Sequence, residues 1–204
     1  MIDVGRALKL EQLAVGALEP VDMIIQPGEI FGLAGPSGSG KTRFLRAIAD
    51  LEPHSGRAWL AEVARTSISG HQWRRHVMLV PAESRWWHDR VGEHFPDSTR
   101  SVPAALALPA ESLGWSVSRL SSGEKQRLAL FRAVAMAPSV LLLDEPTANL
   151  DSDSAARVES WLLETIRARR LAALWVAHDP AQLQRVSDRS FRIDSGALRE
   201  SSWT

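Results

Sequence analysis

The sequence predicts an α/β fold built on a parallel sheet, and three observations lead to this prediction. Two segments, Ser139–Leu143 and Leu171–Ala177, are almost wholly apolar and have the length of strands buried on both faces. Amphipathic helices alternate with such strands, most clearly at Ser152–Ala168. A glycine-rich loop, Gly35–Thr42, lies between an expected strand at Glu29–Leu33 and an expected helix. Alternating strands and helices predict a sheet covered by helices.

The other elements follow from the same patterns and from turn residues. Further strands are expected at Ala7–Leu13, Met23–Ile25, Arg57–Leu60 and Val77–Pro81, and further helices at Arg43–Leu51, Ser121–Ala137 and Pro180–Val186. A closing hairpin is expected from Arg189–Ile193 and Ala197–Glu200. The segment from Glu83 to about Val117 is rich in Trp, Pro and Ser, and we expect loops there with one short helix near Ala104–Leu108.

Composition excludes several classes of function. The chain has 204 residues, the length of one domain, and a formal net charge of zero, so no basic field gathers nucleic acid and no nucleic-acid partner is expected. It has no cysteine, which excludes disulfides and thiol catalysis. Met1–Gly5 lack the pattern of a signal peptide, and the apolar runs are far shorter than the roughly 20 residues that cross a bilayer. We therefore expect a cytoplasmic location.

A phosphate-binding loop is the first chemical signal. The stretch Gly35-Pro36-Ser37-Gly38-Ser39-Gly40-Lys41-Thr42 matches the pattern G-x-x-x-x-G-K-[ST] in full. Gly38 and Gly40 let the backbone curl so that its N–H groups face phosphate oxygens. Lys41 is expected to reach the β- and γ-phosphates and the Thr42 hydroxyl to bind Mg²⁺. A glycine-rich turn with a chance lysine is the alternative, but the flanking strand and helix favour a nucleotide site.

A pair of acids follows the most apolar strand. Val140–Leu143 is followed directly by Asp144 and Glu145. We expect Asp144 to hold Mg²⁺ opposite Thr42 and Glu145 to polarise the water that attacks the γ-phosphate. A buried acid pair without a cation is costly, so a metal partner is favoured over a solvated turn.

Three further stretches carry a resemblance to a known family. Leu120-Ser121-Ser122-Gly123-Glu124-Lys125-Gln126-Arg127 resembles the signature sequence of the ABC ATPases, with Ser for one glycine and Glu for the glutamine. Pro146–Asp151 resembles the D-loop of that family, and His178 resembles its switch histidine. The elements occur in the family's order, and the resemblance extends from about Val4 to Glu200.

The resemblance implies an ABC-type P-loop domain over residues 1–204. Its RecA-like core and small antiparallel β subdomain would comprise residues 1–82 and 136–204, and a short helical subdomain would comprise about 83–135. It also implies a head-to-tail homodimer, or a pair with another such subunit, with ATP bound at the seam. Ser121, Ser122, Gly123 and Glu124 would close on the γ-phosphate held by the other copy, Asp151 would cross the interface, and His178 would contact the γ-phosphate or the attacking water. Plain N-capping remains the alternative for Ser121, and a structural role the alternative for His178.

Two features usual in the family are missing. Residues 10–21 contain no aromatic residue to stack on adenine, so Val15 or Leu18 is the candidate base contact, and weak discrimination between ATP and GTP is expected. Ala82 stands where the family has its Q-loop glutamine. Glu83, one position further on, is the candidate metal contact, and the alternative is a solvated loop acid.

The adjacent tryptophans Trp86 and Trp87 are the candidate docking site for a membrane subunit, because two neighbouring indoles rarely face one core and exposed aromatics suit interfaces. The function expected is the ATP-hydrolysing subunit of an ABC transporter, peripheral on the inner face of the membrane through a separate permease. Ser122–Arg132 and Leu174–Asp179 resemble iron-export ATPase subunits. The alternative is an ABC ATPase without a pore, such as one in iron–sulphur cluster assembly.

Overall fold

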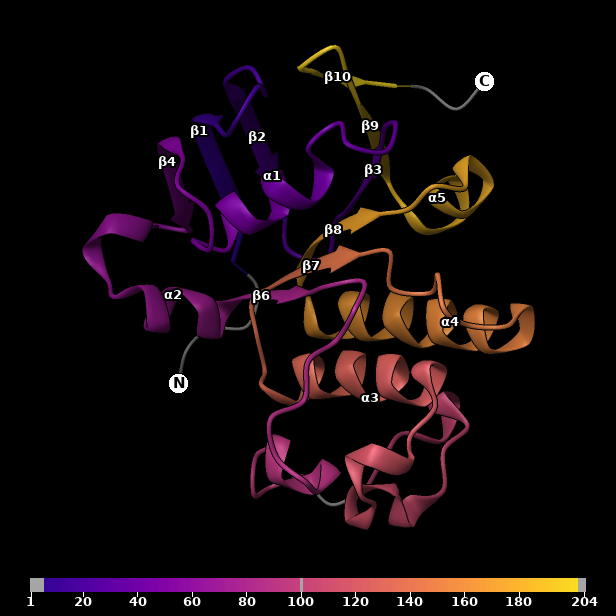
Figure 1. The fold of residues 1–204 in the computed structure, drawn as a ribbon. Coiled ribbons are helices and arrows are strands. Elements are labelled where there is room, and N and C mark those ends of the chain that lie inside the picture. The colour runs from indigo at the N-terminus through magenta and orange to yellow at the C-terminus, as the bar shows by residue number, and fades with distance from the viewer. Residues whose placement is uncertain (1–5, 100, 202–204) are drawn as a thin grey trace.

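Two β-sheets form the framework of the protein (Figure 1). The computed structural model describes residues 6–99 and 101–201, so Met1–Gly5, on which the signal-peptide expectation rests, lie outside the described residues. In chain order the strands are Leu8–Ala14 (β1), Val21–Ile25 (β2), Ile30–Ala34 (β3), Ser55–Leu60 (β4), Val63–Ala64 (β5), Val77–Val80 (β6), Val140–Asp144 (β7), Ala172–Val176 (β8), Arg189–Asp194 (β9) and Ala197–Glu200 (β10). The helices are Lys41–Ile48 (α1), Gly70–His76 (α2), Ser122–Ala135 (α3), Ser152–Arg169 (α4) and Pro180–Val186 (α5).

The larger sheet has the order β10-β9-β3-β8-β7-β6, and β9, β3, β8, β7 and β6 are parallel to one another. The hairpin partner β10 runs antiparallel at one edge. The smaller sheet has the order β2-β1-β4-β5 and is wholly antiparallel. The predicted α/β fold with a small antiparallel β subdomain is therefore confirmed.

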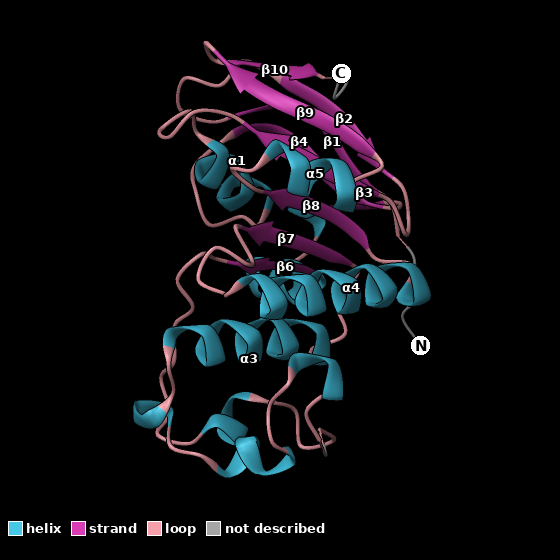
Figure 2. Ribbon diagram, turned by 90° about the vertical axis from the view of Figure 1, so that its right-hand side faces the viewer, coloured by secondary structure: helices cyan, strands magenta, loops and turns pink. Residues whose placement is uncertain are grey.

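The apolar strand β7 contributes side chains to two hydrophobic clusters, one on each face of the larger sheet. Successive side chains of a strand point to opposite faces. Val140 and Leu142 pack in the cluster that joins the two sheets and includes Phe44 of α1, whereas Leu141 and Leu143 pack in a second cluster with α3 and α4. Figure 2 shows α3 and α4 lying together on that second side of the sheet.

The segment between β6 and α3 contains short 3₁₀ turns and loops. The expected helix near Ala104–Leu108 is a 3₁₀ turn, Ala104–Leu106, whose Leu106 is fully buried. Helix α2 was not predicted from the sequence. It is a short helix that begins with a capping box formed by Ser69 and Gln72. Its Trp73 is fully buried, and the indole N–H donates a hydrogen bond to the carbonyl oxygen of Ile48 at 2.8 Å.

Candidate nucleotide-binding site

The parallel strands bring the phosphate loop, the acid pair and His178 to one edge of the larger sheet. The glycine-rich loop follows β3, Asp144 ends β7, and His178 lies two residues beyond β8, which pairs with both β3 and β7. The carboxyl ends of these strands meet at the same edge, where open α/β sheets bind ligands. Residues 102 positions apart in the sequence are thereby in direct contact, as the pair Thr42 and Asp144 shows.

The loop has the curled backbone that the motif requires. Gly38 and Gly40 have φ angles of 77° and 101°, in the left-handed region that favours glycine. An added Cβ on either glycine would meet nothing within 4 Å, so the loop leaves open space beside its backbone. The Ser39 hydroxyl is buried without a hydrogen-bond partner in the part of the chain that the structure describes. A buried donor of this kind fits a phosphate oxygen as its acceptor.

Lys41 lies folded over the loop and is only 6% exposed. Its ammonium group donates to the carbonyl oxygens of Gly35 and Pro36 at 2.8 and 2.9 Å. Burial lowers the pKa of Lys41, while the charges of Glu145 and Asp144 oppose that shift. An ammonium group has three donors and these two carbonyls take two, so Lys41 retains capacity for an anion at the loop.

Asp144 and Thr42 form the second part of the site. The Thr42 hydroxyl donates to Asp144 Oδ2 at 2.8 Å, and Asp144 is 5% exposed. Burial raises the pKa of this carboxyl, so its charged form lacks a sufficient cation nearby. A hydroxyl and a carboxylate are the oxygen ligands that Mg²⁺ takes when phosphates and waters complete its shell. The residues present therefore fit Mg²⁺ bound together with a nucleotide.

Glu83 is placed less favourably than Asp144. It is exposed on the loop after β6. Within residues 6–99 and 101–201, no three His, Cys, Asp or Glu side chains gather into a group that could hold a metal. Its role as a metal contact stays a prediction.

Glu145 and His178 form a direct pair. His178 Nε2 lies 2.7 Å from Glu145 Oε1. The Glu145 backbone has a φ of 51°, a left-handed conformation that is uncommon for a residue with a side chain and costs energy. Its N–H donates to the carbonyl oxygen of Val176, which fixes the turn at the strand end. The strained turn therefore places the Glu145 carboxylate beside His178.

The signature residues lie at the N-terminus of α3. The Ser121 hydroxyl oxygen accepts from the Glu124 N–H at 3.2 Å, and the Glu124 carboxylate accepts from the Ser121 N–H at 2.8 Å and from its hydroxyl at 2.9 Å. These bonds lower the pKa of Glu124. Ser121 is thus the N-cap of α3.

The D-loop connects the signature helix with the rest of the site. An added Cβ on Gly123 would lie 3.3 Å from the Leu150 side chain, so the two segments are in close contact. Asn149 Nδ2 donates to the carbonyl oxygen of Ala82 at 3.4 Å. Asp151 caps α4 by accepting from the Ser154 N–H at 2.9 Å. The segment from Pro146 to Asp151 therefore contacts both the start of α3 and the loop after β6.

These elements are those of one protein family. A family model described as ABC transporter matches residues 18–148, well over half of the chain and including the phosphate loop, the signature and the acid pair. The chain belongs to the ABC transporter family.

Relatives of this ABC protein have several named roles. It is 34% identical to the lipoprotein-releasing system ATP-binding protein LolD of Granulibacter bethesdensis, in an alignment that covers 94% of this chain and 96% of LolD. It is 32% identical to the sulfate/thiosulfate import ATP-binding protein CysA of Rhodopseudomonas palustris, covering 90% of this chain and 58% of CysA. The ABC protein thus spans little more than half the length of that relative.

A solved structure confirms the fold. It is a dimeric ATP-binding cassette in a post-hydrolysis state with ADP and phosphate bound, and it superposes with a TM-score of 0.76 at 23% identity over 97% of this chain and 99% of its own. In the part of this ABC protein that the structure describes, none of the helices has the length and apolar character needed to cross a membrane.

The structure corrects the prediction for the base contact. Val15 and Leu18 are 5% and 6% exposed and belong to the core cluster between the sheets. Neither side chain presents a surface to a nucleotide base, so this prediction is wrong. Their pattern in the sequence did not reveal that both turn inward from the loop between β1 and β2.

The tryptophan pair has one partly buried and one exposed member. Trp87 is 66% exposed, whereas Trp86 packs against the second core cluster. The Arg132 guanidinium of α3 lies 4.5 Å from the Trp86 ring centroid and 4.9 Å from that of Trp87. Both rings also make edge contacts with His94. Neither Arg132 nor His94 was predicted as a neighbour of the tryptophans, because no pattern in the sequence connects them.

Proposed function

We propose that this ABC protein is the ATP-binding and ATP-hydrolysing subunit of an ABC transporter that energises a separate permease. The convergence of Lys41, Thr42, Asp144, Glu145 and His178 at one sheet edge supports this function most strongly. The relatives named above are ATP-binding proteins of transport systems. No observation favours the iron–sulphur assembly alternative.

Each residue has a defined task in the proposed reaction. The loop N–H groups and Lys41 hold the β- and γ-phosphates, and Thr42 with Asp144 would hold Mg²⁺, which when bound neutralises charge on the phosphate oxygens. Glu145 accepts a hydrogen bond from the attacking water and orients it. His178 lies 2.7 Å from that carboxylate and holds it in position. In the proposed complex His178 would contact the γ-phosphate or the attacking water.

Turnover requires a second copy under this proposal. Ser121, Ser122 and Gly123 at the N-terminus of α3 would meet the γ-phosphate held by the other copy, because helix N-termini favour anions. Asp151 would lie at that interface. The segment of about 83–135 would act as the helical subdomain that moves with α3, and Glu83 is the proposed metal contact on its first loop.

The experiment that tests the reaction is steady-state phosphate release from ATP with and without Mg²⁺. We expect Mg²⁺-dependent turnover that is lost in Lys41→Ala and strongly reduced in Glu145→Gln, with ATP binding retained in the second variant. Undiminished turnover in Lys41→Ala would refute the proposal. Glu83→Ala should lower kcat with little change in nucleotide binding if Glu83 reaches the metal, and an unchanged kcat excludes that role.

We further propose that Trp87, supported by Trp86, is the contact for a cytoplasmic segment of the permease, so that the protein is peripheral on the inner face of the membrane. The exposed indole next to α3 supports this, because a flat apolar anchor suits an interface. Capture of the permease from membranes should fail with a Trp86→Ala, Trp87→Ala variant. Ile24→Ala, which removes another exposed apolar side chain on β2, is the matched control and should capture normally.

A further inference from the structure

The position of Arg43 suggests how the site holds a nucleotide base without an aromatic platform. Arg43 directly follows Thr42 and lies in the first turn of α1, immediately after the phosphate loop. The reacting end of a bound triphosphate is defined by Asp144 and Glu145, so the ribose and base must extend from the other end of the loop. The exposed side chain of Arg43 extends from α1 to Gly16, in the segment between β1 and β2.

The Arg43 guanidinium lies against the loop that joins β1 and β2. An ideal Cβ on Gly16 would fall 2.9 Å from Arg43 Cζ, closer than real Cβ atoms approach, and 3.3 Å from its Nη2. Gly16 is also in the left-handed region, with a φ of 59°. Because Gly16 has no side chain, the guanidinium can rest directly on the backbone of this loop.

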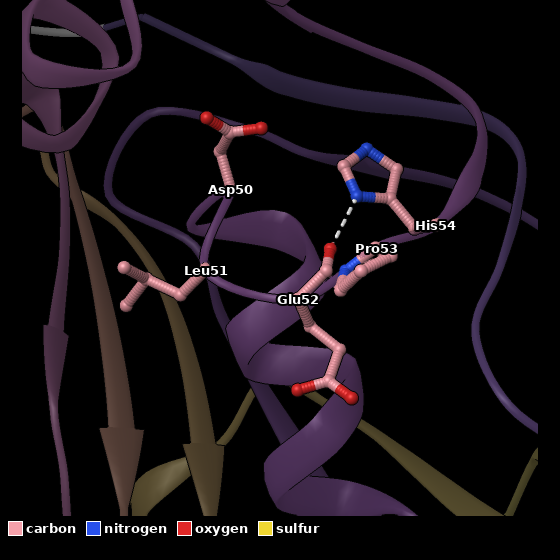
Figure 3. A pocket seen from close by; sticks show the side chains of 5 residues that line it. All are labelled: Asp50, Leu51, Glu52, Pro53 and His54. Atoms are coloured by element: carbon pink, nitrogen blue, oxygen red, sulfur yellow. Dashed lines mark hydrogen bonds between the residues drawn. The ribbon is translucent and has the colours of Figure 1, made fainter.

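Glu52 fixes the guanidinium in this place. Arg43 Nε donates to Glu52 Oε1 at 3.1 Å, and Arg43 Nη2 lies 3.1 Å from the same oxygen. Figure 3 shows Glu52 in the turn after α1, with its carboxylate directed to the side of the turn opposite the ring of His54. The Arg43 side chain still keeps 55% of its area accessible. The group is therefore anchored at its edge and on one side, while the rest of its surface stays open.

We propose that the Arg43 guanidinium, resting on Gly16 and held by Glu52, is the surface on which the nucleotide base stacks. This inference rests on the proposed nucleotide site. A guanidinium is planar and weakly hydrated and stacks on aromatic faces. Stacking of this kind accepts any purine, because every base has a π-face. It therefore accounts for the expected weak discrimination between ATP and GTP.

The test compares nucleotides with a ligand that has no base. Calorimetry would measure the Kd of ATP, GTP and ribose 5-triphosphate, each with Mg²⁺. We expect Arg43→Ala to weaken ATP and GTP binding by about tenfold, equivalent to about 1.4 kcal/mol, and to leave ribose 5-triphosphate unchanged. Arg43→Lys keeps the charge but not the planar group, and it should lose base affinity to the same extent.

Arg46 supplies the matched control. It donates from Nε to Glu52 Oε2 at 3.2 Å one turn further along α1, and Arg46→Ala should leave all three affinities unchanged. Equal weakening of ATP and ribose 5-triphosphate in Arg43→Ala would make Arg43 a phosphate contact and overturn the inference. Unchanged ATP affinity, or full rescue by lysine, would also overturn it. A wild-type protein that binds neither ATP nor ribose 5-triphosphate refutes the proposed function instead.

Discussion

Replacing Arg132 by alanine should release the segment 85–88 from the signature helix α3. Arg132 holds this segment through the rings of Trp86 and Trp87 and through a hydrogen bond from Nη1 to the carbonyl oxygen of Arg85 at 3.1 Å. Burial lowers the pKa of Arg132 to about 10, so the side chain stays charged at neutral pH and all three contacts persist.

The size of the effect follows from these contacts. Each cation–ring contact contributes about 0.5–1 kcal/mol at a partly exposed site. A hydrogen bond from a charged donor adds about 1.5 kcal/mol. Allowing for solvent around Trp87, local opening of the segment should become about 2–3 kcal/mol easier, which is roughly a 30- to 150-fold larger open population.

Hydrogen exchange measures this opening directly. The N–H groups of Trp87 and His88 donate to His94 Nε2 at 2.9 and 3.0 Å, and they exchange when the segment opens. Exchange in a peptide covering 85–94 should speed up by the factor above. Arg132→Lys should fall between wild type and alanine, because it keeps the charge and loses the planar group.

A matched control is available in the same subdomain. The Arg119 guanidinium lies 4.0 Å from the Trp115 ring centroid and has the same chemistry without touching 85–88. Arg119→Ala should leave exchange in 85–94 unchanged. Exchange that stays within twofold of wild type in Arg132→Ala, or that rises equally in Arg119→Ala, would refute the assigned link between α3 and the tryptophan segment.

Three further outcomes are expected. Burial lowers the pKa of His94 below 6.5, so the unfolded chain binds a proton at this histidine more readily than the folded protein does. The free energy of unfolding is therefore fully retained above about pH 6.5 and falls at lower pH by at most about 1.4 kcal/mol per pH unit. Urea unfolding of His94→Gln at several pH values should show a smaller dependence on pH. Trp73→Phe leaves the buried carbonyl of Ile48 without its hydrogen-bond donor, and it should lower the free energy of unfolding in urea by about 2–3 kcal/mol. A decrease of less than about 0.5 kcal/mol would contradict this hydrogen bond. Glu124→Gln keeps the hydrogen bond to Ser121 and removes a negative charge from the N-terminus of α3, the proposed phosphate-facing end. ATP-dependent dimerisation should therefore become several-fold tighter in sedimentation assays. Weaker dimerisation would count against this helix end as a phosphate site.

The elements that the sequence predicted are those with local signals. Composition and spacing alone were enough to predict the apolar strands β7 and β8 and the glycine-rich loop before α1. The serine before α3 likewise indicated the start of that helix, and the amphipathic pattern of residues 152–168 indicated α4. Asp144 and Glu145 were predicted from the apolar strand that they follow, whereas His178 was predicted only from the family resemblance. The three residues meet because strand ends in a parallel sheet share one edge.

The features that were missed depend on contacts between distant segments. Helix α2 has a single buried apolar residue, Trp73, whose burial is decided by α1 rather than by periodicity. Val15 and Leu18 lie in a loop that the sequence does not orient, so their burial became clear only from the packing of the two sheets. The contact between Arg43 and Gly16 joins two such segments and has no sequence signal of its own.

ATP-dependent association of the Glu145→Gln variant is the most direct test of the central claim that two copies close on Mg·ATP. Analytical ultracentrifugation of this variant should show a dimer when ATP and Mg²⁺ are present. The double variant Lys41→Ala, Glu145→Gln should show no ATP-induced association. Failure of Glu145→Gln to associate at saturating Mg·ATP, or equal association of the double variant, would contradict the account.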